Sequence, residues 1–257
     1  MLGAIAGDII GSFYEGRPTK STTFPLFSKH STFTDDTVLT LAVAHSVLEK
    51  TPYDISIKNF ARAYPHAGYG GTFFQWMLSN SSEPYNSWGN GSAMRVSAIG
   101  FAYNTIEEVL AESKKSAEVT HNHPEGIKGA QATAMAIFLA RNGATKTEIK
   151  DYICRNFDYS LDRSLAEIRP IYVFDVSCQG SVPESIISFL ESDNYKSSIR
   201  NAISLGGDAD TMACIAGGIA QAFYKGVPED VVIGVRERLT EDLLEVLDKF
   251  NAKYLPN

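Results

Sequence analysis

Apolar residues recur along most of this chain with the spacing of an α-helix, and this periodicity is the feature that most restricts its fold. The run at residues 35–50, D-D-T-V-L-T-L-A-V-A-H-S-V-L-E-K, is apolar nearly all round and follows Thr34, a favourable N-cap, as expected of a helix buried in a core. Alternating, strand-like patterns are scarce. The sequence therefore predicts an all-α fold, a compact multi-helix bundle.

The remaining helical patterns follow one another closely, and several are opened by Pro, Ser, Thr or Asp, as helix starts often are. Residues 171–176 form a short β-branched and aromatic run that fits either a strand or an extended loop. Segments rich in Gly, Ser, Asn and Pro predict connections at residues 79–91, 159–162 and 177–182. The further helices are predicted to begin at Ile55, Ser92, Ile106, Pro124, Thr147, Pro183, Ser197, Ala209, Pro228 and Glu241.

Length and charge restrict the domain organisation and the partners. One domain of 257 residues would bury about three quarters of its unfolded surface, so we expect residues 1–257 to form a single domain. The net charge of −7 argues against general nucleic-acid binding, which needs clustered Lys and Arg. No long apolar heptad pattern demands a partner helix, so a monomer is predicted.

Cysteine usage and hydropathy indicate a cytoplasmic protein. Cys154, Cys178 and Cys214 are an odd number, are far apart and show no C-x-x-C spacing, so neither a disulfide framework nor a zinc site is predicted. The first residues, M-L-G-A-I-A-G-D, lack the basic start of a signal peptide, and no stretch of about 18 apolar residues occurs. We therefore expect neither secretion nor a membrane span.

Two acidic clusters stand where polar segments enter apolar helices: F-T-D-D-T at residues 33–37 and G-G-D-A-D-T at residues 206–211. Taken singly, each is more simply a cap, with Thr34 or Asp208 accepting hydrogen bonds from free amide groups. Together they hold four Asp and several Thr hydroxyls, and so many like charges in one place would require a cation. Hard oxygen ligands suit Mg²⁺, Mn²⁺ or Ca²⁺.

Two other motif interpretations fail on context. D-A-D-T resembles the nucleophile loop of haloacid dehalogenase-like phosphatases, but that loop follows an apolar strand, whereas here a helical pattern precedes it. D-D-T-V-L lacks the third acidic residue of the terpene cyclase motif. The five histidines show no H-E-x-x-H spacing, so a histidine-based metal site is not predicted either.

Six motifs in one order resemble the ADP-ribosylglycohydrolase family, which includes the dinitrogenase reductase-activating glycohydrolases and ADP-ribosylhydrolases. Two are the acidic clusters, and the others are G-D-I-I-G-S-F-Y-E at residues 7–15, G-Y-G-G at 68–71, S-W-G-N-G-S-A-M-R-V at 87–96 and T-H-N-H-P-E-G at 120–126. The resemblance spans almost the whole chain. It implies an orthogonal α-helical bundle with two divalent cations, Mg²⁺ first and Mn²⁺ or Ca²⁺ as alternatives, at the floor of an ADP-ribose cleft.

The resemblance also implies roles for individual residues. Glu15 matches a catalytic glutamate, and Asp36 is expected to be essential to turnover because it holds metal. The backbone of a glycine-rich loop suits a diphosphate. The implied metal ligands are Thr34, Asp35, Asp36, Asp208, Asp210 and Thr211, and the implied ADP-ribose contacts are Gly68, Tyr69, Gly70, Gly71, Ser87, Trp88, Gly89, Asn90 and His121.

Several of these residues also have a purely structural interpretation. Glu15 fits a solvated helix end, and Tyr69 and Trp88 fit half-buried core aromatics. His121 and His123 fit caps of the helix that begins at Pro124, and for His123 we favour the cap. For Arg95 the sequence leaves two interpretations open, pairing with a metal-site aspartate or anchoring loops.

The implied reaction is hydrolysis of the bond between C1″ of ADP-ribose and an acceptor on a protein, with Glu15 as general acid or base across an oxocarbenium-like transition state. Two alternatives remain: hydrolysis of a small derivative such as O-acetyl-ADP-ribose, and a non-catalytic binder of ADP-ribose. Clustered carboxylates without a cation cost stability, so their retention argues against the binder. The acceptor linkage is undetermined, and residues 20–33 and 79–85 are the expected lids on that side.

Overall fold

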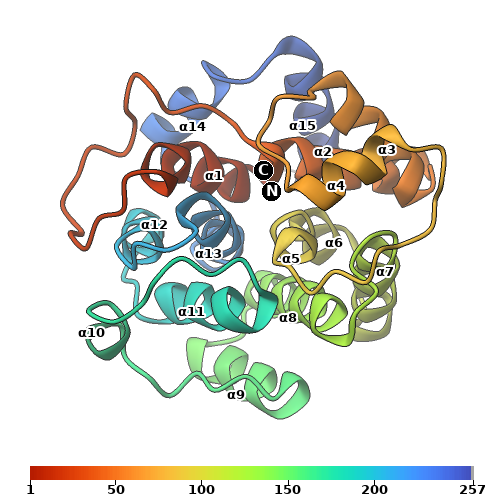
Figure 1. Cartoon of the computed structure of the whole chain (residues 1–257). Coiled ribbons are helices and arrows are strands. Elements are labelled where there is room, and N and C mark those ends of the chain that lie inside the picture. Colours follow the sequence, from red (N-terminus) through yellow and green to blue (C-terminus); the bar gives the residue numbers. More distant parts are fainter. Residues whose placement is uncertain (256–257) are drawn as a thin grey trace.

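Fifteen helices and their connections make up residues 1–255, the part of the chain that the computed structural model describes (Figure 1). The predicted all-α fold is confirmed, because within this range the β-type pairing is confined to an isolated antiparallel bridge between Gly89 and Ser177. The run at 171–176 is thus an extended loop. No helix in the described range is both long and apolar enough to cross a bilayer.

The central element is α13 (Ala209–Phe223), which is buried along almost its whole length. Around it pack α1 (Leu2–Glu15), α8 (Pro124–Arg141), α11 (Cys178–Leu190) and α12 (Tyr195–Ile203), as Figure 1 shows. The predicted helix at 35–50 is α2 (Asp35–Glu49), which packs on α1, α3, α6 and α15. The others are α3 (Tyr53–Ala63), α4 (Gly71–Leu78), α5 (Gly91–Met94), α6 (Ser97–Ala102), α7 (Ile106–Glu118), α9 (Lys146–Phe157), α10 (Leu165–Ile168), α14 (Glu229–Arg236) and α15 (Glu241–Tyr254).

The backbones of α1 and α13 touch along a stripe of small residues. A Cβ atom added to Gly7 would lie 2.0 Å from the carbonyl oxygen of Ala213, and one added to Gly3 would lie 2.5 Å from that of Gly217. Helices normally pack about 8–10 Å apart because side chains separate them. The glycines remove that spacer, so polar groups on α1 lie directly beside the N-terminus of α13.

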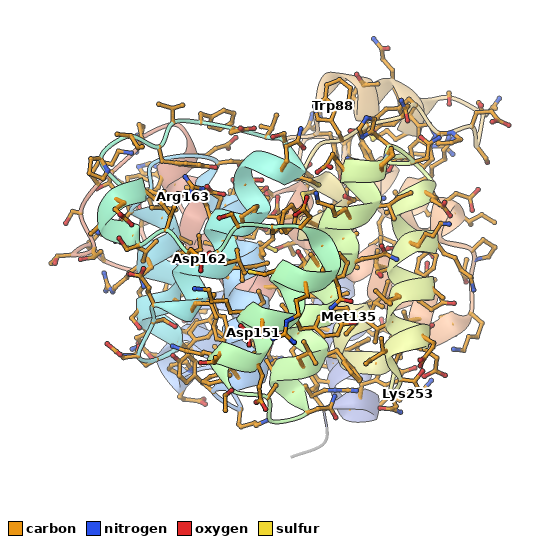
Figure 2. All side chains as sticks on the ribbon, turned by 90° about the horizontal axis from the view of Figure 1, so that it is seen from below. Trp88, Met135, Asp151, Asp162, Arg163 and Lys253 are labelled. Carbon is orange, nitrogen blue, oxygen red and sulfur yellow. The ribbon has the colours of Figure 1, made fainter. Side chains whose placement is uncertain are left out.

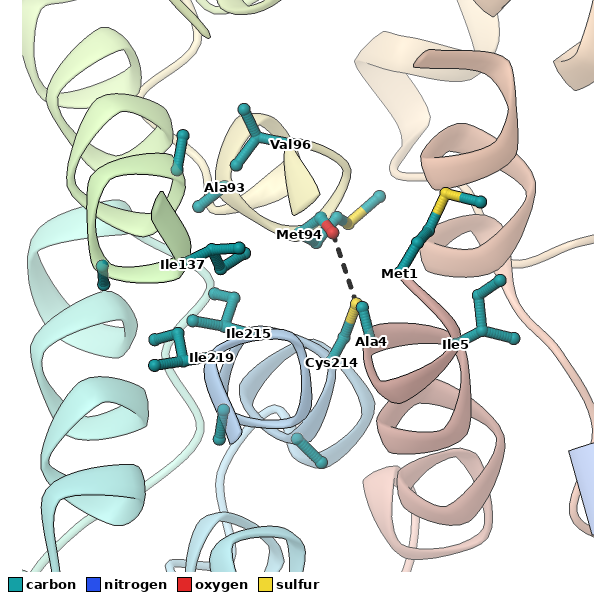
Figure 3. Close-up of a cluster of buried hydrophobic side chains, with 14 of the residues drawn as sticks. Met1, Ala4, Ile5, Ala93, Met94, Val96, Ile137, Cys214, Ile215 and Ile219 are labelled. Atoms are coloured by element: carbon teal, nitrogen blue, oxygen red, sulfur yellow. Dashed lines mark hydrogen bonds between the residues drawn. The ribbon is translucent and has the colours of Figure 1, made fainter. Parts of the chain in front are cut away.

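Apolar packing continues from this helix pair to the layer below the acidic clusters. Figure 3 shows Ala4 of α1 beside Cys214 of α13, with Met1, the N-cap of α1, nearby. Cys214, one helical turn beyond Asp210, donates its thiol hydrogen to the carbonyl of Met94 at 3.3 Å (Figure 3). The buried apolar side chains of the described chain form one cluster, so the polar site rests on a close-packed floor.

The helix starts predicted at Ile106, Pro124, Ala209 and Glu241 are confirmed, and those at Ile55, Thr147, Ser197 and Pro228 differ by one or two residues. The connection at 177–182 and the start at Pro183 are wrong, because Ser177 accepts a hydrogen bond from the amide of Gly180 and starts α11 before the proline. The single helix predicted from Ser92 is interrupted at Arg95 and Val96. Helices α1, α4 and α10 were not predicted from periodicity.

Candidate active site

Three helix ends meet at the site: the C-terminal half of α1 and the N-termini of α2 and α13. Thr34 caps α2 with extended backbone (φ −121°), and its hydroxyl accepts the amide hydrogen of Asp36 at 3.3 Å. Asp208 occupies the corresponding position before α13 but makes no side-chain capping bond to that helix. Its Oδ2 instead accepts a hydrogen bond from Asn90 Nδ2 at 2.8 Å. The two acidic clusters therefore converge, and one of them is tied to the 87–90 segment.

Asp8, which sequence reasoning did not select, links α1 to α2. Its Oδ2 accepts the amide hydrogens of Thr34 at 3.0 Å and Thr37 at 3.1 Å, and its carboxylate also accepts both threonine hydroxyls. Desolvation in this buried position raises its pKa to about 6, although the hydrogen bonds from the two threonines act to lower it. An aspartate within an apolar helix is the signal that could have identified it, because such a residue is rarely buried without partners.

Five of the carboxylates form two groups that share Asp210, and Asp35 belongs to neither group. Ligand atoms of Asp8, Asp36 and Asp210 lie within 4.8 Å of one another, and so do those of Glu15, Asp208 and Asp210. Asp36 Oδ1 is buried without a hydrogen-bond partner among the described residues, while its Oδ2 accepts from Thr211 Oγ1 at 3.2 Å. An all-oxygen donor set with a free buried oxygen fits a hard divalent cation such as Mg²⁺, Mn²⁺ or Ca²⁺.

Burial and mutual repulsion perturb these carboxylates strongly. Burial, followed by the charge of Asp8, raises the pKa of Asp35 to about 8. Burial also raises the pKa values of Asp36 and Asp210 well above the usual range, and neighbouring carboxylates add to the shift. Within residues 1–255 no Lys or Arg forms an ion pair with any of them. The protein itself thus offers little positive charge to offset them, which is the condition a bound cation relieves.

Above the carboxylates opens a cavity of about 630 Å³, within the range of ligand-binding pockets. It is lined by all the residues for which sequence analysis implied a site role, with the exception of Tyr69. Tyr69 instead stacks on Phe73 at 5.1 Å, and its hydroxyl is buried without a partner in the described chain. The lining residues that were not selected include Leu39, Phe73, Asn86, Met94, Phe174, Val176 and Ser177.

The glycine segment at 68–71 leads into α4 at one wall of the cavity. Gly68 adopts φ +104°, a conformation that L side chains rarely adopt, and a Cβ added there would lie 3.6 Å from Asp35 Oδ1. Gly70 precedes α4 without a side-chain cap, and a Cβ at Gly70 or Gly71 would meet nothing within 4 Å. The first amide groups of α4 are therefore accessible from the cavity side, and such groups suit an anion.

A second wall pairs the 87–90 segment with the extended loop before α11. The amide of Asn90 donates to the carbonyl of Val176 at 2.8 Å, and the amide of Cys178 donates to that of Trp88 at 2.9 Å. Trp88 lies at the end of the molecule remote from Lys253 (Figure 2), with 52% of its surface exposed and its ring 5.5 Å from that of His123. Phe174 is equally exposed, at 53%. These aromatic side chains form an open apolar rim.

His121, His123 and Arg95 have different surroundings in the structure. His121 is buried and lines the cavity, whereas the ring of His123 accepts the amide hydrogen of Glu125 at 3.1 Å and so caps α8, as the structural interpretation predicted. Arg95 is fully buried and donates from Nη2 to the carbonyl of Ser116 at 2.7 Å and to Thr120 Oγ1 at 2.9 Å. Arg95 therefore anchors the last turn of α7 and the segment after it; it also lines the cavity, and it forms no ion pair with the aspartates of the two acidic clusters.

The fold and the site define an all-α protein that holds buried carboxylates at the floor of a ligand cavity. The chain belongs to the ADP-ribosylglycohydrolase family, whose model matches residues 1–256. ADP-ribosylhydrolase ARH3 of Gallus gallus is 29% identical to it over 307 residues, covering 87% of this chain and 84% of the relative, and the Homo sapiens protein of that name is 28% identical with the same coverage.

Two further proteins extend the comparison. ADP-ribosylarginine hydrolase Tri1 of Pseudomonas putida is 25% identical over 272 residues, covering 90% of this chain and 72% of the relative. A solved structure described as an ADP-ribosylglycohydrolase-related protein complex superposes with a TM-score of 0.76 at 22% identity, covering 99% of this chain and 97% of that chain. At this identity the superposition shows that the two proteins share a fold.

Proposed function

We propose that this protein is a metal-dependent hydrolase that cleaves the glycosidic bond between C1″ of ADP-ribose and an acceptor on a protein side chain, releasing ADP-ribose. The observation that carries the proposal is the pair of carboxylate groups sharing Asp210 at the floor of a cavity in a chain of this family. The names of the ARH3 and Tri1 relatives support the reaction class. The name of Tri1 favours arginine as one acceptor to test.

The proposed metal ligands are Thr34, Asp35, Asp36, Asp208, Asp210 and Thr211, which would hold two divalent cations, Mg²⁺ in the first instance. Asp8 stands in one carboxylate group and Glu15 in the other, so each is close enough to affect a bound cation. When bound, the cations would align the ribose hydroxyls, offset the carboxylate charge and acidify the attacking water. Asp36 and Asp210, as deeply buried carboxylates, are expected to matter most for retention of metal.

In the proposed reaction, the oxygen of water forms a bond to C1″ as the bond from C1″ to the acceptor atom breaks. One proton of water then travels to the departing atom. Glu15 is the side chain proposed to carry it, because it lines the cavity at the end of α1. Partial desolvation and then the charges of Asp208 and Asp8 raise its pKa, so the carboxyl stays protonated to higher pH, as a general acid requires.

The remaining cavity walls suit the rest of ADP-ribose. The amide groups at Gly68, Gly70 and Gly71 are proposed to bind the diphosphate, while Ser87, Gly89, Asn90 and His121 contact the adjacent sugar and phosphate groups. The exposed ring of Trp88 is proposed to pack on the ligand. For Tyr69 we propose no direct contact from the hydroxyl, because that group is buried away from the cavity lining.

The test is a panel of substrates in which ADP-ribose is attached to arginine, serine, glutamate or nucleic acid, with O-acetyl-ADP-ribose as the small-molecule member. Free ADP-ribose is measured with Mg²⁺, with Mn²⁺ and with excess chelator. We expect release from at least one protein-linked substrate, loss of release in chelator, and a Glu15→Gln variant that is slower by about 10²–10⁴ while binding ADP-ribose normally. Undiminished turnover in chelator would exclude the metal-dependent mechanism.

Three broader expectations belong to the same proposal. One hydrophobic cluster runs through the described chain, which supports a single domain over residues 1–257. Cys154, Cys178 and Cys214 are free thiols, which supports a reducing, cytoplasmic location. We also propose a monomer without general affinity for nucleic acid, and light scattering during size-exclusion chromatography would reveal any stable dimer.

A further inference from the structure

The segment that carries His121 into the cavity is held by a chain of hydrogen bonds that the proposed chemistry does not use. Arg95 Nη2 lies 2.9 Å from Thr120 Oγ1, and Thr120 Oγ1 lies 2.7 Å from His121 Nδ1. Arg95 and Thr120 have no exposed surface, and His121 is 5% exposed where it lines the cavity. These three side chains therefore form a buried row that ends at the cavity wall.

The direction of each bond in this row follows from the chemistry of its donors. A guanidinium has only donors, so Thr120 Oγ1 must accept from Arg95. The hydroxyl retains one hydrogen, and His121 Nδ1 lies 2.7 Å from Oγ1; the Tyr85 hydroxyl is also nearby but forms no hydrogen bond of normal geometry with Thr120 among residues 1–255. If Nδ1 carried a proton and donated to Oγ1, the hydroxyl hydrogen could turn only toward the Tyr85 hydroxyl, which is placed less well than Nδ1 at 2.7 Å, and a poorly made buried bond is costly. The hydroxyl therefore donates to Nδ1.

The protonated imidazolium is disfavoured at the same place. Burial, followed by the positive charge of Arg95, lowers the pKa of His121 well below its usual value. Arg95 has no carboxylate partner to neutralise it in the described chain, and its Nε and Nη1 groups are buried without hydrogen bonds. A neutral ring whose Nδ1 accepts a hydrogen bond carries its hydrogen on Nε2.

The geometry around Nε2 leaves that hydrogen available to a ligand. Nε2 makes no hydrogen bond within the described residues, and two glycines face it: an added Cβ would lie 3.1 Å away at Gly91 and 3.6 Å away at Gly89. Both glycines also line the cavity. A side chain at Gly91 would press on the ring, so the absence of side chains keeps the space beside Nε2 open.

We propose that Arg95 and Thr120 are positioning residues that hold His121 as the neutral Nε2–H tautomer, so that the ring donates one hydrogen bond from Nε2 to an acceptor oxygen of bound ADP-ribose. The identity of the ligand rests on the proposed function, whereas the tautomer does not. Arg95 also lines the cavity, but its unpaired nitrogens are buried, so we assign it no hydrogen bond to the ligand. Its role is to occupy one acceptor position of the Thr120 hydroxyl and thereby direct the hydroxyl hydrogen toward Nδ1.

The tautomer is tested by two-dimensional NMR of protein labelled with ¹⁵N in its histidines, with Mg²⁺ present, at neutral pH. A His121→Gln variant assigns the signals, and the other four histidines report whether the fold is retained. We expect the Nε2–H pattern in the wild-type protein and in Thr120→Ser, which keeps the hydroxyl. In Thr120→Val, which replaces the hydroxyl by a methyl group of similar size, we expect a mixture of the two neutral tautomers.

Affinity for ADP-ribose, measured by calorimetry on the same proteins, is the second readout. We expect Thr120→Val to bind about tenfold more weakly than wild type, and Thr120→Ser to stay within about twofold. A wild-type spectrum showing Nδ1–H or imidazolium would overturn the inference, and so would an unchanged Nε2–H pattern in Thr120→Val. Wild-type protein with the expected tautomer but no affinity for ADP-ribose would refute the proposed function and leave the hydrogen-bond row standing.

Discussion

Metal binding at the carboxylate cluster should release protons and should therefore tighten as pH rises. Burial and then the charge of Asp8 raise the pKa of Asp35 to about 8. At pH 7 such a group is still about 90% protonated, and a protonated carboxyl is a poor cation ligand. Asp36 and Asp210, whose pKa values are also raised well above the usual range, add to the protons that must leave.

The expected magnitude follows from this count. Release of one proton makes the Kd for Mg²⁺ fall about tenfold, or ~1.4 kcal/mol, for each unit of pH below about 7, and less steeply as the pH approaches the pKa of about 8. Isothermal titration calorimetry at fixed pH, in two buffers with different ionisation enthalpies, counts the protons directly. Asp35→Asn should release about one proton fewer than wild type.

The matched control is Asp248→Asn, which makes the same side-chain replacement at an exposed residue paired with Arg236. It should leave both the Kd and the proton count unaltered. A Kd that is constant from pH 6 to pH 8, together with no proton release, would refute the argument that burial keeps these carboxylates protonated in the metal-free protein.

The same pKa shifts set the pH dependence of stability in metal-free protein. A carboxyl whose pKa is higher in the folded than in the unfolded protein stabilises the folded state when it is protonated. Its stabilising contribution is complete below the unfolded pKa of 3.8. It is lost as the pH rises through the folded pKa, which is about 8 for Asp35. The melting temperature without metal should therefore fall between pH 4 and pH 8. Saturating Mg²⁺ should remove most of that decline, and a metal-free melting temperature that increased over this range would contradict the sign.

Three further changes separate the proposed metal ligands from the scaffold. Asp210→Asn should weaken Mg²⁺ binding by about 10²-fold or more, measured by calorimetry, because both carboxylate groups share this residue. Asp8→Asn should lower the free energy of unfolding in urea by ~2–4 kcal/mol, since the amide nitrogen would face threonine donors, and an unchanged value would show that these bonds are dispensable. Gly7→Ala should cost ~3 kcal/mol or more because α1 would be pushed off α13, whereas Gly16→Ala, with open space around it, should be neutral within about 0.5 kcal/mol.

The position of each acidic cluster could be predicted from the sequence, but the contact that brings the two clusters together could not. Thr34 and Asp208 precede strongly apolar helices, so capping chemistry and periodicity locate both acidic clusters at helix N-termini. Their convergence depends on contact between α1 and α13, which are far apart in the chain. The small residues that permit this contact, such as Gly7 and Ala213, have no local pattern that distinguishes them from ordinary helix residues.

Other features escaped prediction because tertiary contacts override local signals. Pro183 indicates a helix start by its backbone geometry, yet Ser177 caps α11 earlier, so the proline lies inside the helix. The apolar run at 171–176 resembles a strand, but exposed Phe174 and Val176 line a cavity instead of a core. Asp8 is not predicted because an isolated acidic residue has no periodicity, and its four donors come from the N-cap and first turn of α2.

The contact between the first helix and α13 has a consequence for how the protein is made. About 200 residues separate Asp8 from Asp210, so the two carboxylate groups assemble only after the whole stretch between them has been synthesised. Non-local contacts of this kind slow folding because a long loop must close before they form. During synthesis the glycine stripe of α1 stays uncovered, and the emerging chain has no complete carboxylate cluster until α13 occupies the centre of the bundle.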